Sequence, residues 1–184
     1  MFDQRLPYYR VQRNRPGTPG QPVRWLWEDI YKFFVASPSS RRKYLVEIRR
    51  YPASLYTADF YAKTPGSPDR YRLRTNQFVL GAIGGTVLDI LARVLRDDPA
   101  ACFGFLAAAL PEETSDRMTK RFRVYSRMLQ RRVALPEPND FARVRLLADE
   151  ASSAIFVVPS HLFHQPDELA RIVTRYQEIF REAF

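Results

Sequence analysis

The sequence predicts a single α+β domain, built on a mostly antiparallel sheet of about five to six strands with helices packed on one face. Three observations lead to this prediction. The chain has 184 residues, of which 46% are hydrophobic, enough to bury one core of ordinary size. Short runs rich in aromatic and β-branched residues follow one another between turn sequences, as antiparallel strands do. Longer segments repeat their apolar residues at helical spacing.

The expected strands are the segments 44–49, 55–63, 70–75, 101–107, 143–147 and 154–158. The first two are joined by a turn around Pro52, and the last two form a hairpin. Segment 101–107 is almost entirely apolar, which predicts a buried central strand. In segment 70–75 successive side chains point to opposite faces of the sheet, so Arg70, Arg72 and Arg74 share one strongly basic face.

Four segments have the apolar spacing of helices, namely 23–36, 77–96, 116–132 and 166–183. Asn76 is suited to cap the second helix, and Thr114 or Ser115 to cap the third. Pro166 lies in the first turn of the last helix, where its missing N–H is tolerated. The strands and helices together form one domain over residues 23–184.

Residues 1–22 are rich in Arg, Pro, Gly and Gln, and the prolines at 16–22 exclude a helix or a central strand there. We expect an extended basic arm. Its Arg10, Arg13 and Arg15 are interleaved with Tyr8 and Tyr9, a combination suited to contacts with phosphates and bases. A solvated tail without a ligand is the alternative interpretation.

The net charge of +9 is unevenly placed along the chain. Residues 1–76 hold 15 Lys and Arg against 6 Asp and Glu, whereas residues 77–184 hold 14 of each kind. This asymmetry favours a partner that is a polyanion or an acidic protein. The alternative is a compositional bias, because Arg outnumbers Lys 25 to 4 as it does in proteins of GC-rich genomes.

The segment 116–132 carries the clearest charge pattern. At 100° per residue, Met118, Phe122, Tyr125 and Leu129 fall on one side of the expected helix. Four basic residues fall on the other side, namely Lys120, Arg123, Arg127 and Arg131. Like charges one turn apart destabilise a helix by about 0.2–0.5 kcal/mol per pair, so something must offset the repulsion. A bound polyanion would do so, and so would nearby acids; a merely solvated basic face is the third interpretation.

No catalytic residue can be assigned from the sequence. The two histidines, His161 and His164, are spaced to share a metal on a helix, but no third ligand lies near them, so a surface loop is the main interpretation. The acids Glu112, Glu113 and Asp116 follow the central strand, where they could bind a divalent metal or stabilise the start of the next helix. Weighing both, we expect no metal and no cofactor.

The chain has the features of a cytoplasmic protein. No run of about 18 apolar residues is present, which predicts no membrane span, and the first residues lack the layout of a secretory signal. The single cysteine, Cys102, cannot form an internal disulfide, and one cysteine excludes zinc fingers and disulfide scaffolds. Because Cys102 lies in the most apolar strand, we expect it to be buried and unreactive.

The passage TKRFRVY at residues 119–125 follows the strand with Phe103, Gly104 and Phe105 and precedes the strand SAIFVV at 153–158 and a terminal amphipathic helix. This arrangement resembles a group of small bacterial α/β proteins in which a TKRFRxY-type helix is followed by a strand that begins Ser-Ala. The resemblance covers residues 76–184. It implies a fold and a bacterial source but no reaction, because the group has no assigned activity.

These observations favour a small, basic, non-catalytic protein that binds nucleic acid or an assembly that contains it. The contacts would come from Arg70, Arg72, Arg74, Lys120, Arg123, Arg127 and Arg131, with Arg10, Arg13 and Arg15 of the arm. One alternative is an interaction subunit that docks on an acidic protein through Trp and Tyr anchors. The other is a small nuclease-like or phosphate-processing enzyme that uses Arg123, Tyr125, His161 or His164.

Overall fold

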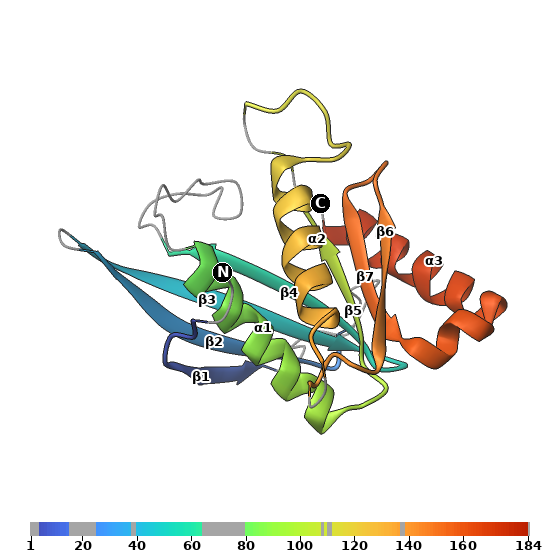
Figure 1. The fold of residues 1–184 in the computed structure, drawn as a ribbon, viewed down its shortest axis with the longest axis horizontal. Coiled ribbons are helices and arrows are strands. Elements are labelled where there is room, and N and C mark those ends of the chain that lie inside the picture. Colours follow the sequence, from blue (N-terminus) through green and yellow to red (C-terminus); the bar gives the residue numbers. More distant parts are fainter. Residues whose placement is uncertain are drawn as a thin grey trace.

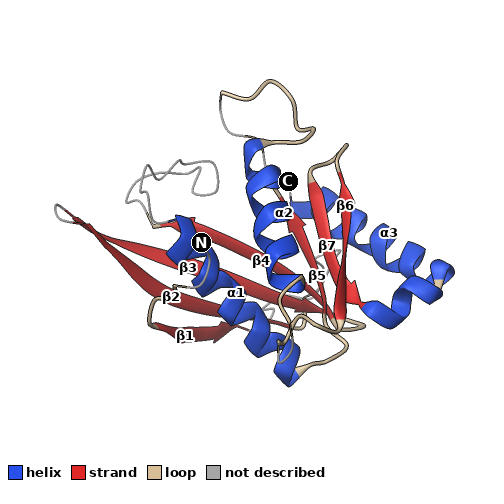
Figure 2. Cartoon of the chain, in the orientation of Figure 1, coloured by secondary structure: helices blue, strands red, loops and turns tan. Residues whose placement is uncertain are grey.

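The computed structural model describes residues 4–14, 25–37, 40–63, 80–107, 109, 112–136 and 139–183. In this part of the chain one seven-stranded sheet is accompanied by three α-helices and a short 3₁₀ helix (Figures 1 and 2). The strand order is β1-β2-β3-β4-β5-β7-β6, and every neighbouring pair is antiparallel except β4 and β5. The predicted α+β class with a mostly antiparallel sheet is confirmed, with seven strands instead of five to six.

The first four strands run in succession as an antiparallel meander: β1 (Tyr8–Asn14), β2 (Trp27–Ser37), β3 (Ser40–Tyr51) and β4 (Leu55–Ala62). The helix α1 (Leu80–Asp97) then crosses over the sheet to β5 (Cys102–Leu106), which pairs parallel to β4. A parallel neighbour requires such a crossover, because a tight turn can only join antiparallel strands.

The rest of the chain completes the sheet beyond β5. Helix α2 (Lys120–Val133) leads to the hairpin of β6 (Val144–Asp149) and β7 (Ala154–Pro159), and β7 pairs with β5. The 3₁₀ helix η1 (Ser160–His164) then precedes the terminal helix α3 (Pro166–Ala183). The expected strands at 44–49, 55–63 and 101–107, the final hairpin, the helix at 77–96 and the terminal helix are confirmed within a few residues. The expected strand 70–75 lies outside the described residues.

The predicted helix at 23–36 is wrong, because this segment contains strand β2. Its residues Tyr31, Phe33 and Val35 are buried in alternation with partly exposed neighbours, which is the period of a strand. Three apolar residues of the segment, Ile30, Phe33 and Phe34, also fit a helical spacing, and that coincidence misled the prediction. The enrichment in aromatic and β-branched residues favours the strand.

The sequence predicts that all helices pack on one face of the sheet, and this prediction is wrong. Helices α1 and α2 share one apolar cluster with the inward side chains of β2, β3 and β4 and with Ile155 and Val157 of β7. Helix α3 packs on the opposite face, where Phe156 and Val158 of β7 join a second cluster. Because successive side chains of β7 point to opposite faces, this one strand is buried on both sides.

Helix α2 begins later than predicted. Its N-cap is Thr119, whose Oγ1 accepts a hydrogen bond from the backbone N–H of Phe122 at 3.1 Å and donates to the carbonyl of Ala107 at 2.8 Å. The expected caps Thr114 and Ser115 therefore lie before the helix, and so does Met118, which is exposed and has a φ of 48°. Because Thr119 caps α2 and also bonds to Ala107, the residue after β5, it fixes the start of α2 relative to the sheet.

Residues 8–14 of the expected arm form the edge strand β1, which pairs with β2 through an irregularity between Arg10 and Gln12. The hydroxyl of Tyr8 donates to Asp89 Oδ2 at 3.0 Å, and the backbone N–H of Leu6 donates to Thr86 Oγ1 at 2.9 Å. These two contacts attach the segment to α1. None of the helices in the described part of the chain combines the length and apolar character needed to cross a membrane.

The hydroxyl of Tyr176 ties α3 to the place where β4 and β5 pair. It accepts the backbone N–H of Tyr56 at 3.1 Å and donates to the backbone carbonyl of Tyr56 or Cys102. Gly104 makes room for this ring, since a Cβ atom at Gly104 would lie 2.5 Å from one ring carbon of Tyr176. The absence of a side chain at Gly104 thus lets α3 approach the sheet closely.

We expect Tyr176→Phe to lower the free energy of unfolding by about 1–3 kcal/mol, because the substitution leaves the buried N–H of Tyr56 without an acceptor. The matched control is Tyr125→Phe, since the Tyr125 hydroxyl has no hydrogen bond among the described residues; it should be nearly neutral. Urea denaturation followed by circular dichroism measures both. Equal effects of the two substitutions would contradict the assigned role of the Tyr176 hydroxyl.

We expect Gly104→Ala to destabilise the protein by about 1–3 kcal/mol, because the new methyl group overlaps the Tyr176 ring and α3 must shift to relieve the overlap. The same denaturation measurement checks this expectation. An unchanged midpoint would show that α3 does not lie as close to β5 as described.

Candidate nucleic-acid interface

Helix α2 separates its apolar and basic residues onto different sides. Phe122, Met128 and Leu129 are buried against the sheet and α1, and the Tyr125 ring lies 5.4 Å from that of Phe60 on β4. The predicted apolar side is therefore confirmed apart from Met118, which lies before the helix, and Met128 is buried in addition. Burial of these side chains holds α2 on the sheet and fixes which of its residues face outward.

The outward side of α2 carries four exposed basic residues, as the sequence pattern predicts: Lys120, Arg123, Arg127 and Arg131. Lys120 Nζ lies 3.7 Å from Glu112 Oε1. No ion pair is formed by Arg123, Arg127 or Arg131 with any residue that the structure describes. The segment Lys120–Val133 contains six basic residues and no acidic one, so no charge within the helix compensates them.

Two of the acids that precede α2 contact its first turn. Glu113 Oε1 accepts the backbone N–H of Lys120 at 2.7 Å, and Glu112 pairs with the Lys120 side chain. A carboxylate at this end is favourable because the helix dipole is positive there. Asp116 contributes its backbone carbonyl, which accepts from Ser153 Oγ. These contacts fit the interpretation of the acids as residues that begin the helix, and they do not reach the three arginines further along.

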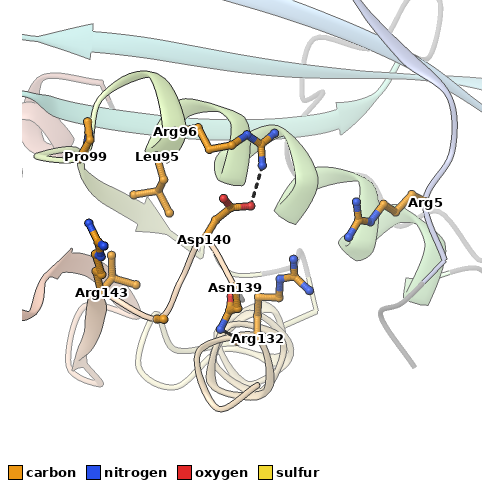
Figure 3. A pocket seen from close by; sticks show the side chains of 10 residues that line it. Arg5, Leu95, Arg96, Pro99, Arg132, Asn139, Asp140 and Arg143 are labelled. Atoms are coloured by element: carbon orange, nitrogen blue, oxygen red, sulfur yellow. Dashed lines mark hydrogen bonds and ion pairs between the residues drawn. The ribbon is translucent and has the colours of Figure 1, made fainter. Parts of the chain in front are cut away.

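A cavity of about 560 Å³ lies between the C-terminal parts of α1 and α2 and the turn before β6 (Figure 3). Four arginines line it, namely Arg5, Arg96, Arg132 and Arg143, together with one acid, Asp140. In Figure 3 the guanidinium groups of Arg5, Arg96 and Arg132 are turned toward the same part of the cavity. The lining therefore carries an excess of positive charge.

The four arginines of the cavity differ in their partners. Arg96 Nη1 lies 2.6 Å from Asp140 Oδ2, and Arg5 Nη1 lies 2.6 Å from Asp89 Oδ1. Arg143 forms no ion pair with a described residue, and Arg132 Nε is buried without a hydrogen-bond partner there. A buried N–H without a hydrogen-bond partner costs about 1–3 kcal/mol of stability.

The cavity lies at the C-terminal ends of two helices, where the helix dipoles oppose an anion. Each dipole is equivalent to about half a negative charge, and the side-chain amide of Asn139 offsets part of it by donating to the carbonyls of Arg132 and Leu135. Arg5 and Arg96 are each paired with a carboxylate, so the guanidinium groups of Arg132 and Arg143 remain against two half charges. The balance of charge in the cavity still favours an anion.

The arginines of β1 have partners inside the protein. Arg13 forms a two-fold hydrogen-bonded pair with Asp29, with Nε–Oδ1 and Nη2–Oδ2 distances of 2.7 Å, and Arg10 Nη1 lies 3.2 Å from the same carboxylate. The Asp29 side chain is buried, and the guanidinium of Arg13 also lies over the Trp27 ring. Arg10 and Arg13 thus fasten the edge strand to β2. Arg15, Arg70, Arg72 and Arg74 lie outside the described residues.

The histidines and the cysteine considered for catalysis have no neighbours among the described residues that would activate them. His161 and His164 are exposed on η1, and the described residues contain no group of three potential metal ligands. Cys102 is buried in β5, and burial raises the pKa of its thiol to about 12. At neutral pH the thiol is therefore protonated and a poor nucleophile.

A comparison of the chain with protein families, with curated proteins and with solved structures found no match. The resemblance of residues 76–184 to small bacterial proteins with a TKRFRxY helix therefore stays a hypothesis.

We expect Cys102 to resist thiol reagents in the folded protein, because its pKa of about 12 leaves almost no thiolate at pH 7–8 and the side chain is buried. Labelling with a chromogenic disulfide reagent, with and without denaturant, measures this. The thiol should react only on unfolding, and rapid labelling of the native protein would contradict its assignment as an unreactive core residue.

Proposed function

We propose that the protein binds nucleic acid without catalysing a reaction on it, and that the exposed face of α2 contacts the phosphate backbone. One observation carries the proposal: Arg123, Arg127 and Arg131 lie on one exposed face and form no ion pair with a described residue. Arg10 and Arg13 of β1, in contrast, are held by the buried Asp29.

The geometry of the row suits a phosphate backbone. Residues four apart in a helix rise by about 6 Å per step, so the Cα atoms of the three arginines span about 12 Å along the helix. Each guanidinium can donate two parallel hydrogen bonds to one phosphate, an arrangement that a lysine cannot make. Phosphate contacts would also offset the repulsion between like charges one turn apart.

The cavity extends this surface at the C-terminal end of α2. The last turn of the helix carries both Arg131 and Arg132, and Arg131 is exposed whereas Arg132 lines the cavity. A backbone that follows the row would therefore reach the cavity at its end. Contacts of this kind hold a nucleic acid in place but carry no sequence information, so we expect binding with little sequence preference.

We expect the triple substitution of Arg123, Arg127 and Arg131 by Gln to weaken binding of a short labelled DNA duplex by at least about tenfold at low salt, because three phosphate contacts are lost. Fluorescence anisotropy measures the affinity. The loss should be the same for duplexes of different sequence.

The control variant removes three positive charges from residues outside α2. Arg145, Arg171 and Arg181 are exposed and form no ion pair with a described residue, so their triple substitution by Gln lowers the net charge equally. This variant should bind almost as the original protein does. Equal losses in both variants would mean that only net charge matters, and no binding of the original protein at low salt would refute the proposal.

A further inference from the structure

A second basic surface lies on the other side of the sheet from α2. Three of the four lysines of the chain, Lys32, Lys43 and Lys63, come from the neighbouring strands β2 and β3 and from the residue that follows β4. Helices α1 and α2 cover the opposite face of these strands, and α3 packs near β5, β7 and the turn between β3 and β4. None of the described helices covers the face that carries the lysines.

The strand register shows that these lysines share one face with two aromatic rings. Phe34 lies opposite Lys43, and Tyr9 lies opposite Lys32, and directly opposed residues of antiparallel strands point to the same side. The backbone N–H of Lys63 donates to the carbonyl of Lys43 at 2.8 Å, which places Lys63 next in the row. We call this surface the lysine–tyrosine face, defined by Tyr9, Lys32, Phe34, Arg41, Lys43 and Lys63.

The cations of this face lie against its rings instead of against carboxylates. Lys32 Nζ lies 4.6 Å from the centroid of the Tyr9 ring, and Arg41 Cζ lies 4.1 Å from that of the Phe34 ring. No ion pair joins Lys32, Arg41, Lys43 or Lys63 to a described residue. Desolvation and the neighbouring charges of Lys63 and Lys32 lower the pKa of Lys43, as expected for cations gathered without a counter-charge.

Among the described residues, the acids on the same face of the sheet form ion pairs with Arg49 and not with the lysines. Arg49 Nε lies 2.7 Å from Glu28 Oε1, and its Nη atoms lie 2.9 Å from Glu47 Oε2 and 3.4 Å from Asp59 Oδ2. Glu47 also accepts from the Tyr61 hydroxyl at 2.7 Å. Lys43 and Glu47 are four residues apart on β3, about 13 Å along the strand. Among the described residues, the face is thus divided into an acidic cluster around Arg49 and a basic part near the β2–β3 hairpin end.

The basic part is accessible. Tyr9 is 50% exposed, and Arg41 and Lys63 are exposed as well. Figure 1 shows the β2–β3 hairpin extending beyond the helices at the end of the molecule far from α3. A long flexible ligand could therefore lie across this end of the sheet without meeting a helix.

We propose that the lysine–tyrosine face binds single-stranded nucleic acid, with a base stacked on Tyr9 and phosphates held by Lys32, Lys43 and Lys63. Exposed aromatic rings between cations on an open sheet are suited to unpaired bases, which offer a flat face to stack and a charged backbone alongside. An acidic protein segment would use the cations but has no comparable use for the ring. This inference rests on the proposed function and adds a ligand class and a surface to it.

The test compares two ligands of equal charge: a labelled oligothymidylate of about ten nucleotides and a backbone of the same length without bases. We expect Tyr9→Ala to weaken the binding of oligothymidylate by at least about fivefold. The affinity for the base-free backbone should change by less than about twofold, because this ligand has no base that can stack on the ring. The matched control is Val11→Ala, which shortens another exposed apolar side chain of β1 and should change neither affinity.

The joint substitution of Lys43 and Lys63 by Gln should weaken the binding of both ligands. The control substitutes Arg171 and Arg181 by Gln, and it should lower neither affinity by more than about twofold. The inference is overturned if Tyr9→Ala acts equally on both ligands or acts no more than Val11→Ala. It is also overturned if polyglutamate of equal charge displaces the oligothymidylate as well as unlabelled oligothymidylate does, because the face would then suit an acidic protein.

The two proposals can fail separately. The Tyr9→Ala effect should persist in the variant that lacks Arg123, Arg127 and Arg131, since the surfaces lie on opposite sides of the sheet. Duplex binding that depends on α2, without any preference for bases at Tyr9, would refute only the inference drawn here. The absence of binding to every nucleic acid would refute both.

Discussion

The parallel pairing of β4 with β5 determines most of the architecture. Only three residue pairs join these strands, yet they connect the four-stranded meander to the three strands that follow. A parallel pair needs a crossover, so α1 must lie across one face of the meander, and α2 lies beside it on the same face. The Tyr176 hydroxyl then holds α3 over the junction from the other side. Away from the β3–β4 turn that α3 reaches, the opposite face of β1 to β4 is left without a described helix.

This arrangement places two groups of cations on opposite sides of one sheet. On the helical side, the buried residues of α2 turn Arg123, Arg127 and Arg131 outward. On the other side, strand register places Lys32 and Lys43 on the same face as diagonal neighbours. In both groups the cations have no carboxylate partner among the described residues, whereas the arginines of the sheet that hold strands together are paired. The cations that stabilise the fold are therefore distinct from the two groups without a carboxylate partner among the described residues.

The sequence predicts those features of the fold and the candidate site that depend only on residues close together in the chain. The terminal helix is predicted to the residue, because Pro166 and the acids at 167 and 168 mark its start and its apolar residues repeat at one period. The exposed row on α2 is equally local, since spacing alone places its residues on one face. Strand β2 is missed because its aromatic residues fit two periods at once, and in so short a segment periodicity does not decide.

The remaining features depend on tertiary structure. The cavity takes Arg5, Arg96, Arg132 and Arg143 from four separate segments, and no spacing in the sequence brings them together. The lysine–tyrosine face requires the register of β1, β2 and β3, and it could not be found while β2 was expected to be a helix. In the arm, the sequence shows the basic residues Arg10 and Arg13 but not that the buried Asp29 holds them.

If unpaired cations bind this protein to nucleic acid, the affinity of the unmodified protein depends on salt concentration, and a titration at several salt concentrations measures this dependence. Each phosphate contact made by a cation releases counterions, so the logarithm of the binding constant should fall linearly with the logarithm of salt concentration. Three contacts on α2 alone predict a slope of about −2.7 for duplex DNA, and further contacts make it steeper. An affinity that does not change between about 50 and 200 mM salt, or no binding at the lower concentration, would contradict the account.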